Sequence, residues 1–550
     1  MKKYSYIALT FVIVNLINIS CKSILDEEVV SGVTAEYYNT PEGFIKAVDA
    51  SYVPLRSYYG SEIGEALTVF GTDEYTNGGH GDYQYMNQYT TALNAASPTF
   101  WHLWANFYMA INTCNTVISR GGQVAMGESE RNARLAEVRF LRAHYYFELV
   151  RSFGPIPISL EETIGVQTES VRQPEEDVYK VIIEDLEFAR EHLPTVQKDF
   201  GRATRPAAEN MLALVLLTRG YKSFAKPDDF SRSADLAIGV INNYQHKLLG
   251  NPIAAFNHND ERNNEIIWSV QYTEDLLSNG SGNGSHLFYG AWFSSYSGLV
   301  DSNQPGYGRP WIRFRPTLYG LENFRPLNVD SRYSLTFQNV WYYNDAKGLP
   351  SGAAIGDTAI WVTDKQLNQK DVDLIKSRHP SIALFSWNKN NVNDPWYRPI
   401  NIFPWPEAKF GDYKRVSAFA TEGSRDQIVY RLAETYLIVA EALFKDGKVD
   451  KAVPYVNAIR KRASFPGKES QMEISVKDLS IDFILDERAR ELFGEQKRWH
   501  DLVRTGKLVE RVKLYNPEAA KNIKDFHALR PIPENQITRT SNKVEQNPGY

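Results

Sequence analysis

The feature that most constrains this chain is a helix–turn–helix pattern at residues 431–463, RLAETYLIVAEALFKDGKVDKAVPYVNAIRKRA. Apolar residues recur at helical spacing on both sides of Asp446-Gly447, a pair that favours a turn. Small residues stand where two adjoining helices would touch, namely Ala433, Ala440, Ala442 and Ala452. The segment therefore predicts two amphipathic helices that pack against each other across a tight turn.

Much of the rest of the first and last thirds is also expected to be helical. A helix pair of this length is the unit of the tetratricopeptide repeat, although the other helices do not repeat it residue by residue. Gly154-Pro155 is expected to end one of these helices. The helical pattern is found at residues 41–60, 100–120, 134–157, 175–194, 207–225 and 233–244.

The middle of the chain, about residues 250–425, has a different composition. It is rich in Gly, Pro, Asn and aromatic residues and has few long helical periods. Short strands are expected within EIIWSVQY at 265–272 and within SRYSLTFQNVWYY at 331–343. Because binding residues concentrate on loops held by a rigid scaffold, this part is the expected location of a ligand site.

The N-terminus has the order of a secretory signal. Lys2 and Lys3 precede an apolar run from about Ile7 to Ile19, and small Ser20 precedes Cys21. The run is short for a membrane span, which needs about 20 apolar residues. A cysteine at the cleavage point predicts lipidation of Cys21. An ordinary secretion signal with a chance cysteine, or an uncleaved anchor, are the alternatives.

Charge and cysteine content exclude several classes of protein. The formal net charge is -5, from 61 basic and 66 acidic residues, which argues against a nucleic-acid-binding protein. The chain has two cysteines, so lipidation of Cys21 leaves Cys114 as the one thiol. That excludes an intramolecular disulfide and a cysteine-based metal site. Cys114 lies in an apolar helical pattern and is expected to be buried.

The sequence offers no motif for catalysis or for a cofactor. It has no H-E-x-x-H, G-x-S-x-G, phosphate-binding loop or C-x-x-C. Acids and bases alternate at three- and four-residue spacing in LDERARELFGEQKRWHDLVRTGK, residues 485–507, which favours ion pairs along helices. The segment NHNDERNNE at 257–265 is expected to be a solvated turn, without the oxygen spacing of a calcium loop. No metal and no cofactor is predicted.

Aromatic loops are the strongest indication of function. The chain has 32 Tyr, 27 Phe and 11 Trp, whereas a core alone would favour Phe, because every buried Tyr hydroxyl needs a partner. Tyrosines cluster with Gly, Asn and Asp at residues 71–91, and aromatic residues are dense at 286–316. Flat rings beside polar groups suit sugars, since a ring stacks on the C–H face of a pyranose while polar groups bind its hydroxyls.

The chain resembles the SusD/RagB family of outer-membrane lipoproteins. The resemblance is carried by motifs along the whole mature chain: Cys21 followed by SILDEE, FWHLWANFYMAINTCNTVI, FLRAHYYFELVRSFGPIPI, NVDSRYSLTF, the unit at 431–463, ERARELFGEQKRWHDLVRTGKL, LRPIPENQI and the terminal QNPGY.

The resemblance implies a mostly α-helical fold with about four TPR-like helix pairs and a loop-rich, irregular ligand-binding half that carries short strands. We expect a signal peptide at 1–20 and a single domain at 21–550. Its helical scaffold would span about 41–246 and 427–510, with the loop-rich insert at about 250–425.

The resemblance also implies a function. Family members are lipid-anchored at the cell surface and deliver oligosaccharides to a SusC-like TonB-dependent transporter, without catalysis. The acidic residues after Cys21 resemble an export signal for the outer face of the membrane. Capture of peptides or glycopeptides for a RagA-like transporter is the alternative within the family. A glycan-degrading enzyme is the alternative of another class, because the 66 acidic residues do not exclude a catalytic carboxylate pair.

Positions equivalent to the family's sugar-binding aromatics give the predicted ligand site. Tyr83 and Tyr85 match the loop before the FWHLW helix, and residues of the 286–316 segment match the middle loops. Arg309 is predicted to make a polar contact with the ligand or to contact an anionic sugar. The remaining predicted ligand residues are Trp292, Tyr296, Tyr307 and Trp311.

Overall fold

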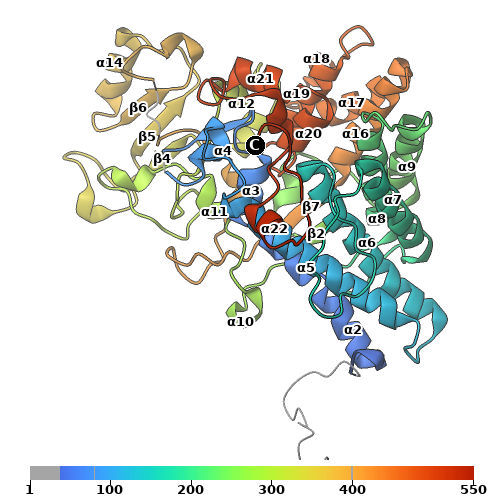
Figure 1. Cartoon of the computed structure of the whole chain (residues 1–550). Coiled ribbons are helices and arrows are strands. Elements are labelled where there is room, and N and C mark those ends of the chain that lie inside the picture. Colours follow the sequence, from blue (N-terminus) through green and yellow to red (C-terminus); the bar gives the residue numbers. More distant parts are fainter. Residues whose placement is uncertain (1–36, 80, 398–400) are drawn as a thin grey trace, which may run out of the picture.

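The computed structural model describes residues 37–79, 81–397 and 401–550 (Figure 1). The predicted signal peptide and Cys21 lie outside these ranges. The described chain consists of a stack of long helices and, beside it, an irregular part with short helices and strands. The yellow lobe around α14 belongs to the irregular part and lies at the opposite side of the molecule from the stack in Figure 1.

The long helices form the scaffold. Each helix packs on its neighbour in the order α5, α6, α7, α8, α9, α16 and α17. The bounds are α5 Pro98–Gly121, α6 Glu128–Phe153, α7 Glu175–His192, α8 Arg205–Arg219, α9 Asp229–Asn243, α16 Leu432–Lys445 and α17 Val449–Arg462. The chain leaves the stack after α9 and returns at α16, so the loop-rich part is inserted between two helices that touch. This arrangement confirms the mostly helical, TPR-like fold.

Local signals set the helix ends as expected. The Thr40 hydroxyl accepts a hydrogen bond from the Gly43 N–H (3.1 Å) and caps α2, Pro41–Ala50. Helix α6 ends at Phe153, directly before Gly154, which has φ +71°. Helices α16 and α17 are joined through Gly447, which has φ +76°. The predicted helix–turn–helix at 431–463 is therefore confirmed.

The inserted part and the chain ends hold the shorter elements. The helices are α3 Glu62–Thr68, α4 Gln84–Gln88, α10 Leu276–Asn279, α11 Ser285–Phe288, α12 Leu318–Glu322, α13 Arg332–Thr336, α14 Gln369–Arg378, α15 Glu407–Phe410, α18 Glu469–Met472, α19 Ile481–Glu491, α20 Arg498–Arg504, α21 Leu508–Tyr515 and α22 Glu534–Thr538. The strands are β1 Tyr75–Asn77, β2 Ile266–Val270, β3 Phe314–Pro316, β4 Val340–Tyr342, β5 Thr358–Thr363, β6 Ala383–Ser386 and β7 Gln427–Arg431.

The strands form three small sheets. Strand β1 pairs antiparallel with β3, and β2 pairs antiparallel with β7. Strand β5 lies between β4, which is antiparallel to it, and β6, which is parallel. The strand predicted at 265–272 is confirmed as β2. All three sheets join segments far apart in the sequence or separated by a loop, so they fix how the inserted part folds back on itself.

Two predicted elements were wrong in extent. The helix expected at 41–60 ends at Ala50 and is followed by a 3-10 turn at Val53–Ser57, since Pro54 has no N–H to continue the α-helix. The strand expected within 331–343 is present as β4 at Val340–Tyr342, but the segment begins as helix α13. There the Asp330 carboxylate accepts a hydrogen bond from the Arg332 N–H (2.9 Å) and turns the chain.

The acid–base segment at 485–507 is structural. Arg488 donates to Asp501 (2.7 Å), and Arg498 donates to Asp73 (2.7 Å), with all four side chains buried. The apolar residues of the segment face the core, as expected: Leu485, Leu492, Phe493, Trp499 and Leu502 are buried. The predicted ion pairs are confirmed, but most of them join different elements rather than successive turns of one helix.

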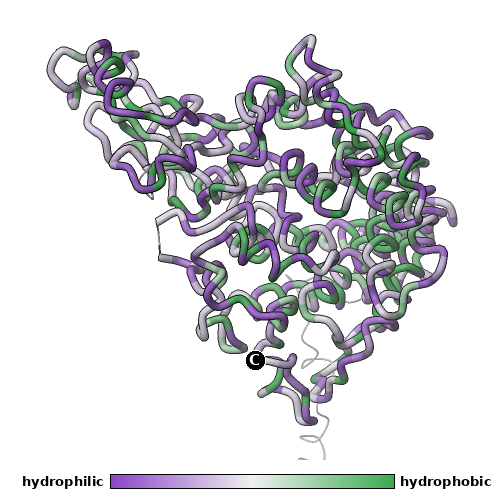
Figure 2. The backbone as a smooth tube through the Cα atoms, turned by 90° about the horizontal axis from the view of Figure 1, so that it is seen from above, coloured by the Kyte–Doolittle hydropathy of each residue, from purple (hydrophilic) through white to green (hydrophobic). Residues whose placement is uncertain are grey.

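The hydrophobic core runs through both parts. One large cluster includes side chains from the helix stack and from the inserted part, Cys114 among them, fully buried as expected. Figure 2 shows apolar residues concentrated among the stacked helices, whereas the protruding lobe is mixed. Among the helices of the described ranges, none combines the length and apolarity needed to cross a bilayer.

Candidate ligand-binding surface

The β1–β3 ladder brings the two predicted aromatic segments together. Asn77 is paired with Phe314, and the Gly78 N–H donates to the Arg313 carbonyl (3.0 Å). The loop after β1 and the segment before β3 therefore leave the same end of the ladder side by side. Tyr83 (φ 58°) and Ile312 (φ 56°) both have left-handed backbone conformations there. Such conformations are uncommon for residues other than glycine, so the surrounding contacts hold the backbone of both segments in place.

Tyr83, Tyr85 and Trp311 lie on the two segments that leave this ladder end, and we call them the first ring cluster. Arg313, rather than a ring contact, links Trp311 to the tyrosine loop. The rings of Tyr83 and Tyr85 are 6.4 Å apart at 46°, and all three side chains are half-buried against the core. The Tyr85 hydroxyl is 2.6 Å from Thr99 Oγ1 of α5, which holds that ring in place. The backbone N–H of Trp311 donates a hydrogen bond to the Leu287 carbonyl (2.6 Å).

Arg313 connects the parts of the first ring cluster. Its guanidinium lies 5.3 Å from the centre of the Trp311 ring. The same group pairs with Glu62 (2.5 Å) and with Asp82 (2.7 Å), the residue before Tyr83. A guanidinium held between a ring and two carboxylates fixes both loops relative to each other.

The tyrosine hydroxyls of this cluster stay protonated. Burial, reinforced by the negative charge of Glu62, raises the pKa of Tyr83 to about 12. Burial also raises the pKa of Tyr85. Both hydroxyls therefore remain neutral near pH 7, where each can donate and accept hydrogen bonds, as a sugar hydroxyl requires.

Trp292, Tyr296 and Tyr307 lie close together in the sequence and we call them the second ring cluster, although within the described ranges no ring contact joins them to one another. The buried ring of Phe293 lies 5.7 Å from the ring of Tyr307, edge to face. The Tyr307 hydroxyl donates to the Tyr342 carbonyl of β4 (2.7 Å), and the Tyr296 ring meets Phe385 of β6 at 6.2 Å. The Trp292 side chain is 47% exposed, the most open of the predicted rings.

The segment 287–313 links the two ring clusters. The Arg313 N–H donates to the Phe288 carbonyl (2.9 Å), and a side chain at Gly290 would lie 2.6 Å from Pro310 Cβ. The segment therefore doubles back on itself in close contact. Within the described ranges, the one ring contact among the predicted residues is that between Tyr83 and Tyr85, so the predicted rings are spread along the surface rather than gathered in one site.

Arg309 is positioned by a third loop. Its Nη1 donates to the Phe419 carbonyl (3.3 Å), and its guanidinium lies 5.6 Å from the Phe419 ring. The Phe419 side chain is 68% exposed. The exposed Phe419 ring, with the Arg309 guanidinium beside it, adds an apolar surface next to the predicted residues. It lies on a loop that the sequence analysis did not identify.

Sequence reasoning missed Arg313, Glu62 and Phe419. Arg313 follows Trp311 by two residues in PWIRFRP, an alternation typical of a strand edge, and that pattern was the available signal. Glu62 and Phe419 had no local signal, because their roles depend on contacts between segments distant in the sequence.

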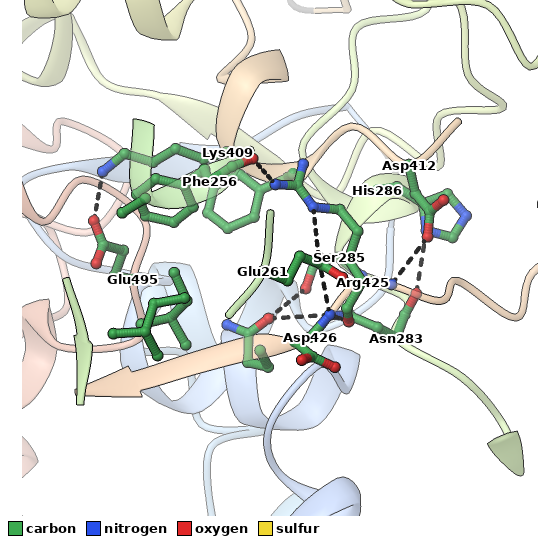
Figure 3. A pocket seen from close by; sticks show the side chains of 15 residues that line it. Phe256, Glu261, Asn283, Ser285, His286, Lys409, Asp412, Arg425, Asp426 and Glu495 are labelled. Atoms are coloured by element: carbon green, nitrogen blue, oxygen red, sulfur yellow. Dashed lines mark hydrogen bonds and ion pairs between the residues drawn. The ribbon is translucent and has the colours of Figure 1, made fainter. Parts of the chain in front are cut away.

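A small chamber lined by charged and apolar side chains lies within the inserted part (Figure 3). Its volume is about 30 Å³, room for a water molecule and not for a sugar. Figure 3 shows Lys409 and Glu495 paired at one end (2.6 Å) and His286 beside Asp412 at the other. Burial raises the pKa of Glu261 to about 7 and that of Asp426 to about 6. The chamber is a packed network of charged side chains.

The segment 257–265 borders this chamber instead of forming a solvated turn throughout. Asn263 and Glu265 are buried, and the Asn263 side chain donates to the Asp260 carbonyl (2.8 Å). Within the described part of the chain, no group of three or more His, Cys, Asp or Glu side chains is arranged to hold a metal ion.

Two family models match the chain. One, described as the SusD family, matches residues 264–550. The other, described as "Starch-binding associating with outer membrane", matches residues 45–217. The first covers more than half of the chain, and together the two include the helix stack and the inserted part.

Relatives and solved structures extend the match. The chain is 27% identical to the SusD-like protein P2 of Formosa agariphila over 100% of both chains. It is 26% identical to the starch-binding protein SusD of Bacteroides thetaiotaomicron over 77% of this chain and 74% of that protein.

Solved structures share the fold. A laminarin-binding SusD-like protein aligns with a TM-score of 0.68 at 23% identity, covering 93% of this chain and 100% of that one. Surface glycan-binding protein A from Bacteroides thetaiotaomicron, in complex with laminarihexaose, also aligns with a TM-score of 0.68, at 19% identity over 92% and 99% of the two chains. Because the SusD family model matches residues 264–550, more than half of the chain, the chain belongs to the SusD family.

Proposed function

We propose that this protein binds oligosaccharides at the surface made by the two ring clusters and delivers them to a SusC-like TonB-dependent transporter. The observation that carries the proposal is the set of half-buried and exposed rings on loops beside a rigid helix stack. Relatives whose names state starch or laminarin binding support the choice of ligand class.

The geometry favours stacking on sugars. The Trp292 ring is exposed for contact, while Tyr83, Tyr85, Tyr307 and Trp311 are anchored by the core on one side. Anchored rings lose little conformational entropy when a ligand binds, so each contact contributes more of its stacking energy. Neutral tyrosine hydroxyls and the Arg309 guanidinium supply hydrogen bonds at the edges of the rings.

The protein binds glycans without cleaving them under this proposal. The acids of the 485–507 segment, such as Glu487 and Asp501, are buried in ion pairs with arginines. Burial opposes the charge of Asp501, but Arg488 and Arg504 lower the pKa of that carboxyl to about 2, so it holds no proton to donate near pH 7.

We further propose that Cys21 carries the lipid that anchors the protein in the outer membrane, facing the cell surface. The description of one family model, association with the outer membrane, supports this location. Two or more acyl chains on one cysteine are sufficient for stable anchoring. The helix stack is the face expected to contact the transporter, and residues 21–550 are expected to act as a single domain.

Peptide or glycopeptide capture for a RagA-like transporter is the second candidate. It would need a strand edge or a charged channel in place of exposed rings. The exposed Trp292 ring favours a sugar, and the test below includes peptides.

Affinity electrophoresis tests the ligand class. The chain from Lys22 onward is run in native gels that contain laminarin, starch or other plant and host polysaccharides, and a peptide panel is titrated separately. We expect retardation by one polysaccharide class, reduced in Trp292→Ala, and no new products after prolonged incubation. Retardation by none of them together with peptide binding would overturn the glycan proposal, and product formation would overturn the binding-only role.

A further inference from the structure

A groove that none of the earlier paragraphs describes lies on the lobe that carries α14. The outer face of the β4–β5 pair and one side of α14 line it, and its volume is about 560 Å³. This is comparable to pockets that hold small-molecule ligands. None of the predicted ligand residues lines it.

Strand register and helix spacing create the groove. Val340 is paired with Trp361, and Tyr342 with Thr358, so all four side chains share one face of the sheet. The lining residues of α14 stand at positions 371, 374, 375 and 378, one stripe of a helix. The sheet's other face, with Trp341 and Ile360, is buried in the core. The groove therefore lies between two regular elements of the lobe, the face of the β4–β5 pair on one side and helix α14 on the other.

Aromatic and apolar surface is available inside it. The Tyr342 side chain is 48% exposed and Leu374 is 52% exposed. The Trp361 ring is half-buried against the small core of the lobe. Two accessible rings, one from each strand, provide a stacking surface of the kind proposed for the two ring clusters.

The charges of the groove are predominantly positive. The Lys365 ammonium lies 5.8 Å from the centre of the Trp361 ring, and Arg378 and His379 stand at the C-terminal end of α14. Asp371 is the one acidic side chain among the described residues that line the groove. Lys365 and Arg378 are exposed and form no ion pair within the described ranges. Both cations are therefore available to a ligand.

The second ring cluster meets the same sheet at its edge strand, β4. The Tyr307 hydroxyl donates to the carbonyl of Tyr342, whose side chain lines the groove (2.7 Å). Tyr296 packs on Phe385 of β6, which is paired with Val362 and therefore points to the face opposite the groove. A chain of sugars that passes over Tyr307 would reach the groove around the edge of β4.

We propose that the α14 groove binds further residues of an extended glycan, and that those residues carry negative charge, as carboxylate or sulfate ester. The inference rests on the proposed glycan binding at the ring clusters. It deepens that function by assigning a second binding region and a ligand charge. Rings would stack on the sugars, while Lys365 and Arg378 would pair with the anionic groups.

A matched pair of polymers tests the charge assignment. Laminarin and its sulfate ester, and polygalacturonate and its methyl ester, are each titrated into the chain from Lys22 onward. Wild-type protein should bind the charged member of a pair about tenfold more tightly, and the difference should shrink as salt rises. The combined substitution Lys365→Gln and Arg378→Gln should remove the difference.

The control removes equal charge from the same helix. Lys370 and Lys376 are exposed on α14 but do not line the groove, so Lys370→Gln with Lys376→Gln should keep the preference. Absence of a preference in wild type, or equal loss in both double variants, would overturn the groove assignment. Binding of neutral laminarin that depends on Trp292 would still support the proposed function, whereas binding of no glycan at all would overturn that function itself.

Discussion

Arg431 is the residue whose removal should weaken the fold most clearly. It ends β7 where the chain returns to the helix stack, and its side chain is 1% exposed. Its guanidinium donates to Glu265 (3.0 Å), Glu491 (2.8 Å) and Glu495 (2.7 Å), all of them buried. Glu265 directly precedes β2, Glu491 is the last residue of α19, and Glu495 lies in the turn that follows α19. One side chain therefore ties the inserted part to the scaffold.

The expected cost follows from the charges left behind. Arg431→Met leaves three buried carboxylates with fewer partners, and breaking a buried ion pair in this way costs about 3–5 kcal/mol. For about 500 residues that unfold together, the unfolding entropy is about 1 kcal/mol per kelvin, so the melting temperature should fall by about 3–5 °C. Urea unfolding of the chain from Lys22 onward, at pH 7, measures the free energy of unfolding directly.

A surface pair supplies the control. Lys461 pairs with Glu473, and the two side chains are 49% and 43% exposed. Lys461→Met introduces the same side chain at an exposed pair and should cost less than about 1 kcal/mol. Equal and small losses in the two variants would refute the claim that the Arg431 network holds the insert to the scaffold.

The pH dependence gives an independent check. Burial opposes the charge of Glu491, but Arg462, Arg431 and Arg332 lower the pKa of that carboxyl to about 2. Its stabilising contribution is therefore present above the unfolded-state pKa and is lost as the pH falls from about 4.5 toward 2. Removing Arg431 raises the pKa of Glu491, so the difference between wild type and Arg431→Met should narrow over that interval. A constant difference would contradict the role given to Glu491.

Three further outcomes follow from the described contacts. Burial raises the pKa of Glu261 to about 7, so the wild type loses stability as the pH rises through that value. The gain in unfolding free energy from Glu261→Gln should therefore be about 1–2 kcal/mol larger at pH 8 than at pH 4.5. Urea midpoints of the two proteins at the two pH values measure this gain, and an equal gain at both would contradict the prediction. Gly290→Ala would place a methyl group 2.6 Å from Pro310 Cβ, so it should lower the unfolding free energy by about 1–3 kcal/mol and weaken glycan binding. Gly308 has open space around it, so Gly308→Ala should change neither quantity. Burial raises the pKa of the Cys114 thiol to about 12, so a thiol reagent should label it only after denaturant unfolds the chain, and prompt labelling of the native protein would contradict the buried position.

The sequence predicted the scaffold well because its helices are long and carry their own signals. The alanines of 431–463, the cap at Thr40 and the stop at Gly154 each act within a few residues. The predicted helix pair became α16 and α17 for that reason. The packing of α9 against α16 was beyond this reasoning, since no local pattern reports a contact across the insert.

The inserted part was harder, because its order depends on distant partners. Strand β1 pairs with β3, with Tyr75 opposite Pro316, and that pairing decides which rings meet. Sequence reasoning did not foresee that Arg313 links Trp311 to the loop of Tyr83, or that Tyr307 bonds to strand β4. The wrong strand at 331–336 has the same origin, because a side-chain contact of Asp330 overrides local strand propensity.

Isothermal titration calorimetry of ring variants tests the central claim most directly. The polysaccharide class found by electrophoresis supplies the oligosaccharide, and wild type is compared with Trp292→Ala and Trp311→Ala. Tyr455→Ala, on α17 of the helix stack, is the control. The account predicts saturable heat with wild type and control, and a loss of about tenfold or more in affinity in each tryptophan variant. Unchanged affinity in both tryptophan variants would contradict the account, because the glycan would then bind away from the two ring clusters.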